Sequence, residues 1–87
     1  KLYKLTVNLG KEIGDRIICA VIKQFYTKEK LKNKKIIVFA NLAPRVMRGI
    51  ESQGMLLAAV SEDHKKVLLI QPKFEVNSGT KILFKHD

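Results

Sequence analysis

The chain has 87 residues and a formal net charge of +9, from 17 lysines and arginines against 8 aspartates and glutamates. This length fits a single domain over residues 1–87, and a hydrophobic content of 46% predicts a folded core rather than a disordered tail. No apolar run approaches the ~20 residues that a membrane-spanning helix needs, and no signal-peptide pattern opens the sequence. A single cysteine excludes an internal disulfide, so a reducing, cytoplasmic setting is expected.

The positive charge is concentrated in the first 35 residues, which carry ten basic and three acidic side chains. Six lysines fall between Lys23 and Lys35, with Glu29 as the only acid among them. A small, strongly basic domain is typical of proteins that bind a polyanion, most often nucleic acid. A solvated surface that serves only solubility is the alternative, and charge alone does not separate the two.

The first elements in chain order are two strands and a short helix. Residues 3–9 alternate apolar and polar side chains, which is the period of a half-buried strand, and a polar turn follows at 10–14. Residues 16–22 are apolar on both faces and predict a central strand that is covered on both sides. Thr27 is suited to cap a one-turn helix over 28–31.

The second half of the chain predicts short strands separated by polar turns. The segment 41–49, which contains Pro44 and Gly49, is expected to be an irregular loop. Five or six short strands with one brief helix predict an all-β fold, a small β-barrel or sandwich. The further strand-like runs are 36–40, 54–60, 67–70 and 81–84. Buried positions are expected at Cys19, Ile36, Val38, Leu57 and Leu69.

The sequence offers no catalytic or metal-binding constellation. Cys19 falls inside the doubly apolar strand, where an inert buried thiol is expected rather than a nucleophile. His64 is expected in an exposed turn and His86 in a terminal tail, without a cluster of residues at metal-ligand spacing. Glu62 and Asp63 are adjacent and do not indicate an acid–base pair. The sequence therefore predicts a non-catalytic protein without a cofactor or metal.

The polar segment inside ANLAPRVMRGIESQGMLLAA is the strongest candidate for a binding site. Asn41, Ser52 and Gln53 offer amide and hydroxyl groups. Together with Arg45 and Arg48, such groups suit contacts to a nucleic-acid backbone or to base edges. The alternative is that Asn41 and Ser52 satisfy backbone groups of the loop itself, and the residue pattern alone favours this alternative.

The run NLAPRVMRGIESQGMLLAA resembles the signature loop of a family of tRNA-binding domains with the oligonucleotide-binding fold. The stretch FYTKEKLKNKKIIVFANL resembles the same family's helix, basic linker and fourth strand, and KLYKLTVNLG resembles its second strand. The resemblance spans essentially the whole chain. Domains of this family are appended to the C-terminus of many methionyl-tRNA synthetases, and also occur as free tRNA-binding proteins and in cytokine-like synthetase cofactors.

The resemblance implies a five-stranded Greek-key barrel with one short helix, and non-catalytic tRNA binding that depends on shape. Such binding would assist an aminoacyl-tRNA synthetase in cis or in trans. Carried over residue by residue, it implies tRNA contacts at Lys1, Asn41, Ser52, Gln53 and Met55, with Arg45 and Arg48 beside them. Charge adds a lysine cluster of Lys28, Lys30, Lys32, Lys34 and Lys35, which we expect to supply longer-range attraction.

The chain departs from the family pattern in two places. Val21 stands where the family usually has a small Gly. The family also carries a further strand before the position of Lys1, and this chain begins with Lys rather than Met, so the leading strand of the barrel is expected to be missing. The chain stops where the synthetase-type domain stops, which implies a homodimer.

Two other functions stay open from the sequence. A secretion-related chaperone of the same superfamily binds unfolded peptides, and the turn KEIGD resembles that protein. A charge of +9 and a polar loop favour RNA, because a peptide binder would expose an apolar groove. The third function is a dimerisation module whose contact with tRNA is incidental.

Overall fold

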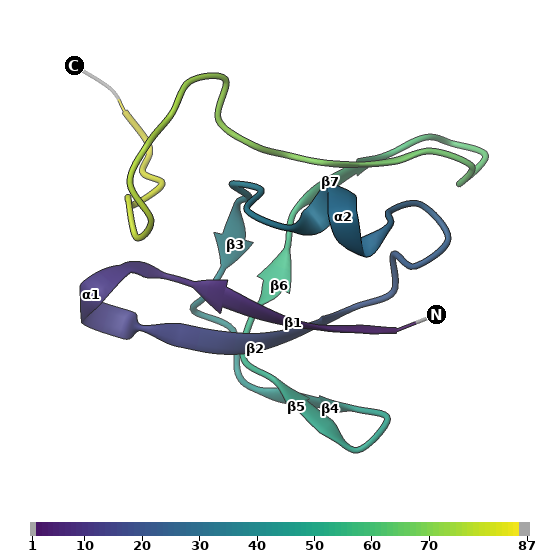
Figure 1. Cartoon of the computed structure of the whole chain (residues 1–87), viewed down its shortest axis with the longest axis horizontal. Helices are drawn as coiled ribbons and strands as arrows, with labels where there is room; N and C mark the ends of the chain where they lie inside the picture. The colour runs from purple at the N-terminus through teal and green to yellow at the C-terminus, as the bar shows by residue number, and fades with distance from the viewer. Residues whose placement is uncertain (1, 86–87) are drawn as a thin grey trace.

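The computed structural model describes residues 2–85 and consists of short strands with two single-turn helices (Figure 1). Strands β1 (Tyr3–Asn8) and β2 (Asp15–Ala20) form the longest pair and run antiparallel, with Lys4 opposite Cys19. Alternating burial along β1 matches the period-two pattern of its sequence. The two strands predicted from the first part of the chain are therefore confirmed.

The connection between β1 and β2 is a helical turn, α1 (Gly10–Ile13), where the sequence predicted only a polar turn. Asn8 Oδ1 accepts a hydrogen bond of 2.8 Å from the backbone N–H of Gly10. The N–H of Gly14 donates to the carbonyl of Gly10 at 2.7 Å, which closes one helical turn. These local bonds satisfy the polar backbone groups of the connection and explain the extra helix.

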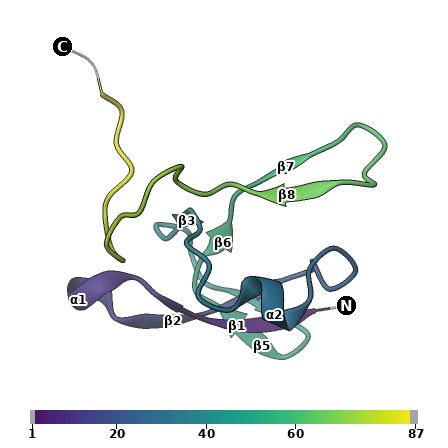
Figure 2. The ribbon, with the colours of Figure 1, turned by 45° about the horizontal axis from the view of Figure 1, so that its top comes forward.

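Helix α2 (Lys28–Leu31) begins and ends where the sequence predicted. Thr27 Oγ1 accepts the N–H of Lys30 at 3.3 Å, which satisfies one of the unpaired donors at the helix start. Tyr26, just before the helix, accepts the Tyr3 hydroxyl at its carbonyl and the N–H of Leu69 at its own hydroxyl, each at 2.9 Å. Tyr26 therefore ties the chain just before the helix to β1 and to β8 (Val67–Leu69), and Figure 2 shows α2 beside β1.

The regular structure of residues 2–85 is mostly strands, as expected for an all-β fold, but the remaining strands pair two by two and do not close into a barrel. The sequence predicted a five-stranded barrel that lacks its leading strand. The barrel does not close because the strands change partner after two or three residues: 55–56 pair with one strand and 58–60 with another. Single backbone bonds among Ile37, Leu57 and Ile70 join these pairs. All three pairs are antiparallel: β3 (Val38–Phe39) with β6 (Met55–Leu56), β4 (Arg45–Met47) with β5 (Ile50–Ser52), and β7 (Ala58–Val60) with β8 (Val67–Leu69).

Two segments differ from their sequence prediction. The stretch 41–49, predicted as an irregular loop, contains β4 and the start of a hairpin with β5. Residues 81–84, predicted as a last strand, are not paired in the structure. Their apolar side chains remain in solvent, with Phe84 98% exposed. An apolar run becomes a strand only where a neighbouring edge accepts its backbone groups, and here none does.

The core gathers around β2, where Ile18 and Cys19 are fully buried. Because successive side chains of a strand point to opposite faces, burial of both neighbours confirms that this part of β2 is covered on two sides. On one face the cover ends at Val21, which is 61% exposed, whereas Ile22 is buried again. Leu69 of β8 is also buried, as predicted.

The core prediction is wrong for Leu57 and too strong for two other residues. Leu56 and Ala58 pack against the core, so the extended backbone turns the side chain of Leu57 outward, to 41% exposure. Ile36 and Val38 are half-buried rather than buried. Ile36 lies just before β3, and Val38 is the first residue of that two-residue strand.

The segment after β8 returns across the molecule to α1 (Figures 1 and 2). Its turn at 77–80 is closed by a bond from the N–H of Thr80 to the carbonyl of Asn77 at 3.2 Å. Gly79 lies against Gly10 so closely that a Cβ on Gly79 would stand 2.8 Å from the Gly10 Cα. A side chain at either position would force the two backbones apart.

Replacing Ile18 with Ala is expected to lower the free energy of unfolding by about 2–5 kcal/mol, because it leaves a cavity in the packed core. The control is Val21→Ala, an exposed aliphatic residue close by in sequence, with an expected change within about 0.5 kcal/mol. Urea unfolding of both variants gives the comparison. Equal losses in the two variants would contradict the placement of the core at Ile18.

Candidate nucleic-acid interface

The outer edge of β2 is closed by the segment that follows β5. Ile17 donates its N–H to Gln53 Oε1 at 3.1 Å, and its carbonyl accepts the Gln53 N–H at 2.8 Å. Two residues along, the N–H of Cys19 bonds to Ser52 Oγ at 2.9 Å. Side-chain oxygens thus act as ladder partners for a strand edge that β1 does not pair.

Ser52 is 2% exposed, and its hydroxyl donates to the carbonyl of Gly54 at 2.9 Å while it accepts from Cys19. Ser52 therefore satisfies backbone groups, as the alternative interpretation of the sequence expected. Gln53 does the same through its Oε1 and is half-buried. Both residues therefore fix the start of the segment that follows β5 against β2.

The β4–β5 hairpin projects from this junction, below β2 in Figure 1. Its loop has two residues, Arg48 and Gly49, with φ of 52° and 80°. Positive φ at both central residues is the geometry of a type I′ turn, whose twist matches that of the flanking strands. Arg48 stands at the tip and Arg45 on β4, and both are exposed. The hairpin therefore presents two guanidinium groups to solvent on a short, defined scaffold.

Arg16, at the start of β2, holds both ends of the segment that contains the hairpin. Its Nη1 donates to the carbonyl of Ala40 at 3.0 Å and to that of Gln53 at 3.3 Å. The sequence interpretation did not assign this residue a role. Its position in the sequence could have indicated a role, because Arg16 stands directly before a run that is apolar on both faces. A charged residue at such a place needs hydrogen-bond partners.

A hollow of about 310 Å³ lies beside this arginine, at the base of the hairpin. Asn41 is exposed and lines the hollow, so the structure leaves its amide available to a ligand. Met55, on β6 opposite Phe39, is half-buried. The residues that line the hollow are Arg16, Ala40, Asn41, Leu42, Pro44 and Gln53.

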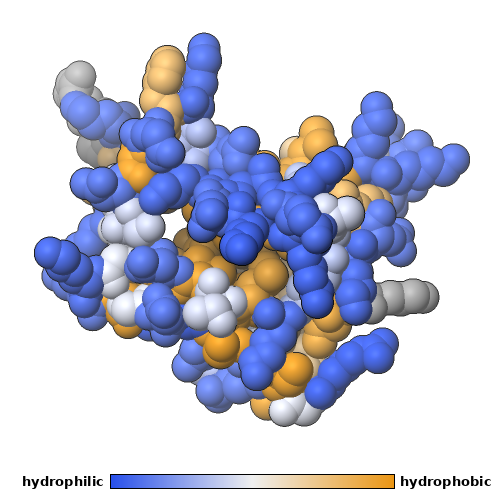
Figure 3. All heavy atoms as spheres, in the orientation of Figure 1, coloured by the Kyte–Doolittle hydropathy of each residue, from blue (hydrophilic) through white to orange (hydrophobic). Residues whose placement is uncertain are grey.

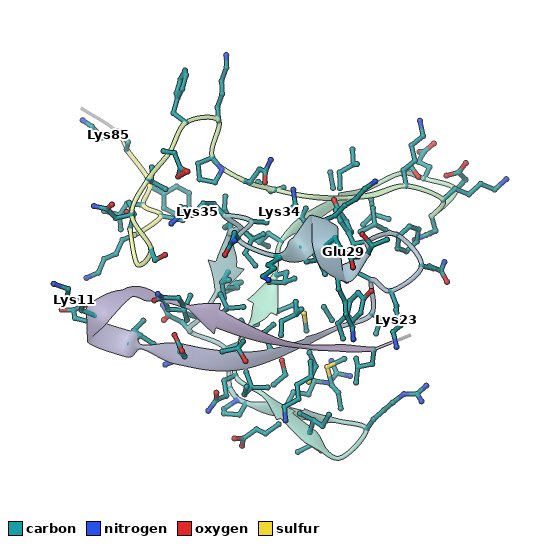
Figure 4. All side chains as sticks on the ribbon, in the orientation of Figure 1. Lys11, Lys23, Glu29, Lys34, Lys35 and Lys85 are labelled. Carbon is teal, nitrogen blue, oxygen red and sulfur yellow. The ribbon has the colours of Figure 1, made fainter. Side chains whose placement is uncertain are left out.

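The lysine cluster is separate from the hairpin. In Figures 1 and 2, α2 and the β4–β5 hairpin lie on opposite sides of the β1–β2 pair. Lys34 Nζ donates to Gln71 Oε1 at 3.3 Å and Lys35 Nζ to Ser78 Oγ at 3.1 Å, so these two are directed to the C-terminal half (Figure 4). The exposed members are Lys28, Lys30 and Lys32. Hydrophilic side chains cover the corresponding upper part of the surface in Figure 3.

The candidate Lys1, and His86 of the predicted terminal tail, lie outside the described residues. Within residues 2–85, no group of three or more His, Cys, Asp or Glu side chains is placed to hold a metal ion. None of the helices in that range is both long and apolar enough to cross a bilayer.

The pKa of Asp63 is lowered first by the hydrogen bond from the Ser61 hydroxyl and then by that from the Lys65 N–H. Both bonds lie within the β7–β8 turn.

A family model described as "Putative tRNA binding domain" matches residues 1–81. The chain belongs to this family. The methionine–tRNA ligase of Pyrococcus horikoshii is 49% identical over 82 residues, which are 94% of this chain and 11% of that protein. The chain thus corresponds to a small part of such a ligase.

Two kinds of solved structure are similar to this chain in backbone and in sequence. A MetRS related protein from Pyrococcus horikoshii has a TM-score of 0.85 and 41% identity, and the match covers 95% of this chain and 73% of that one. The CsaA chaperone of Bacillus anthracis str. Ames has a TM-score of 0.84 and 32% identity, over 92% of this chain and 74% of its own. The backbone therefore resembles a synthetase-related protein and a chaperone about equally.

Replacing Ser52 with Ala is expected to lower the free energy of unfolding by about 1–3 kcal/mol, because the buried N–H of Cys19 loses its acceptor. The matched control is Ser78→Ala, whose exposed hydroxyl meets only a surface lysine, with an expected change within about 0.5 kcal/mol. Thermal and urea unfolding measure both. A Ser52→Ala variant as stable as the control would show that the junction does not depend on this hydroxyl.

Proposed function

We propose that this domain binds tRNA through the β4–β5 hairpin and the hollow at its base, without catalysing a reaction. The observation that carries the proposal is the exposed pair Arg45 and Arg48 on a two-residue hairpin, in a chain of the tRNA-binding family. A rigid cationic hairpin suits recognition of RNA by shape and backbone, since phosphate contacts fix position without reading sequence. The ligase relatives favour a role beside methionyl-tRNA synthetase, in cis or in trans, in the cytoplasm.

The lysines on the other side of the β1–β2 pair have a different role in this proposal. Their charge adds to the field of a +9 domain and raises the rate at which RNA arrives. Different tRNAs are expected to bind with similar affinity, with contacts at the outer corner of the L-shaped tRNA. Lys1, which lies outside the described residues, stays a proposed contact to tRNA.

Two finer features belong to the same proposal. We place the fold in the oligonucleotide-binding class with Greek-key order, supported by its short antiparallel strands and by the MetRS related neighbour.

A homodimer is supported by large apolar side chains that stand in solvent, because exposed apolar surface favours association. These include Phe74, Ile82, Leu83 and Phe84. Sedimentation of the protein at micromolar concentration tests the dimer, and a monomer at all concentrations would contradict it.

Arg48→Asn is the sharpest test of the hairpin, because Asn-Gly is a preferred type I′ pair and the turn is kept while the charge is lost. With about four to six phosphates neutralised, log K should fall with log salt at a slope of about −3 to −5. The variant should reduce the size of that slope by about one. Filter binding of tRNA over a salt series provides the measurement.

The control for Arg48→Asn is Lys66→Asn, which removes the same charge from the exposed end of the β7–β8 turn. Its slope should stay close to that of the unmodified protein. An identical change in both variants would mean that tRNA responds to net charge rather than to the hairpin.

Peptide binding is the second candidate, favoured by the CsaA neighbour and by exposed apolar residues such as Phe84. If the domain recognises tRNA, binding to tRNA should exceed binding to an RNA duplex of equal length, since the duplex lacks the corner. An unfolded apolar peptide should not compete for the tRNA. Displacement of tRNA by the peptide, or equal affinity for duplex and tRNA, would argue against shape recognition.

A further inference from the structure

The hollow at the base of the hairpin contains a guanidinium whose hydrogen bonds all come from one nitrogen. Arg16 Nη1 uses its two hydrogens on the carbonyls of Ala40 and Gln53. Its Nη2 and Nε have no acceptor among the described residues. Arginine carries five donors in a planar fork, so three of them remain for a ligand.

The charge of this guanidinium also lacks an anionic partner. Arg16 is half-buried, and no carboxylate of residues 2–85 forms an ion pair with it. A partly desolvated cation is stabilised by carbonyl dipoles only in part, so an anion that enters the hollow gains more here than on the open surface. The two carbonyl bonds meanwhile fix the orientation of the fork before the ligand arrives.

The lining beside Arg16 is suited to more than a bare anion. Asn41 contributes an exposed amide, while Leu42 and Pro44 contribute apolar surface, in a hollow of about 310 Å³. A nucleotide has these three parts: a phosphate for the fork, a polar base edge for the amide, and a flat base for the apolar side.

We propose that this hollow is a binding site for one nucleotide of RNA, with its phosphate on Arg16 and its base against Leu42 and Pro44. The assignment rests on the proposed tRNA-binding function and names one subsite of it. Because Arg16 holds the chain at both ends of the hairpin segment, a nucleotide bound there sets the position of the RNA relative to Arg45 and Arg48. RNA is favoured over a peptide carboxylate by the two exposed arginines of the adjoining hairpin.

A titration followed by NMR of the Arg16 Nε–Hε signal and the Asn41 side-chain amide tests the subsite directly. Uridine monophosphate should shift both signals in a saturable way, whereas uridine, without the phosphate, should leave the Arg16 signal unchanged. Acetate should shift neither at the same concentration. Absence of a shift with the nucleotide would overturn the proposal, and an acetate shift as large as that of the nucleotide would assign the hollow to carboxylates instead.

Two variants connect the subsite to tRNA. Arg16→Lys keeps the charge but loses the fork, so tRNA affinity should fall about tenfold with the salt slope unchanged. In Arg16→Gln the tRNA affinity should fall further, and the size of the salt slope should decrease by about one. The control is Lys66→Gln, which removes an exposed charge from the β7–β8 turn. Its tRNA affinity should match that of the unmodified protein apart from the small effect of one lost charge.

The outcomes separate the two proposals. If the unmodified protein does not bind tRNA, the proposed function fails, whatever the nucleotide titration shows. If it binds tRNA and both Arg16 variants bind as tightly as Lys66→Gln, only the subsite fails. Backbone amide spectra check that β1 and β2 stay paired in the variants, and the titration of the unmodified protein decides the matter if they do not.

Discussion

The placement of the β4–β5 hairpin depends on the edge of β2 that β1 does not pair. Along this edge the backbone groups of Ile17 and Cys19 need partners, and they receive them from Gln53 and Ser52 rather than from another strand. A buried N–H without an acceptor is costly, so this junction fixes where the chain leaves the core and the hairpin begins. Arg16 adds a third tie by holding the carbonyl groups on either side of the hairpin segment. Ser52 and Gln53, which the sequence offers as contacts to RNA, thus also bond the backbone of the protein itself.

This arrangement divides the positive charge into two populations with different physical effects. The guanidinium of Arg16 is held by two carbonyl groups, and the backbone below Arg45 and Arg48 is set by a two-residue turn, so the proposed contacts to phosphate start from defined positions. The exposed lysines of α2 lie across the β1–β2 pair and are long and mobile, which suits a diffuse field better than a fixed contact. Position and attraction thus come from different parts of one small domain.

Local sequence patterns predicted the elements whose partners are near in the chain. The period-two pattern of β1, the doubly apolar β2 and the Thr27 cap of α2 are all decided by neighbours within a few residues. The hairpin after Pro44 was missed because Arg48 carries its positive φ without being Gly or Asn. The role of Ser52 required knowledge of a partner 33 residues away. Residues 81–84 have an apolar strand-like composition, but a strand also needs an edge to pair with.

The two-residue turn of the β4–β5 hairpin limits how this sequence can change in length. Arg45 faces Ser52 across the hairpin, and the turn of Arg48 and Gly49 sets that register. Insertion of one residue would shift the pairing by one position and move the side chain of Arg45 to the opposite face of the ribbon. Ser52 would then have to leave either its partner on β4 or its bond to β2. Lengthening the tip is therefore tolerated only with a bulge that restores the register.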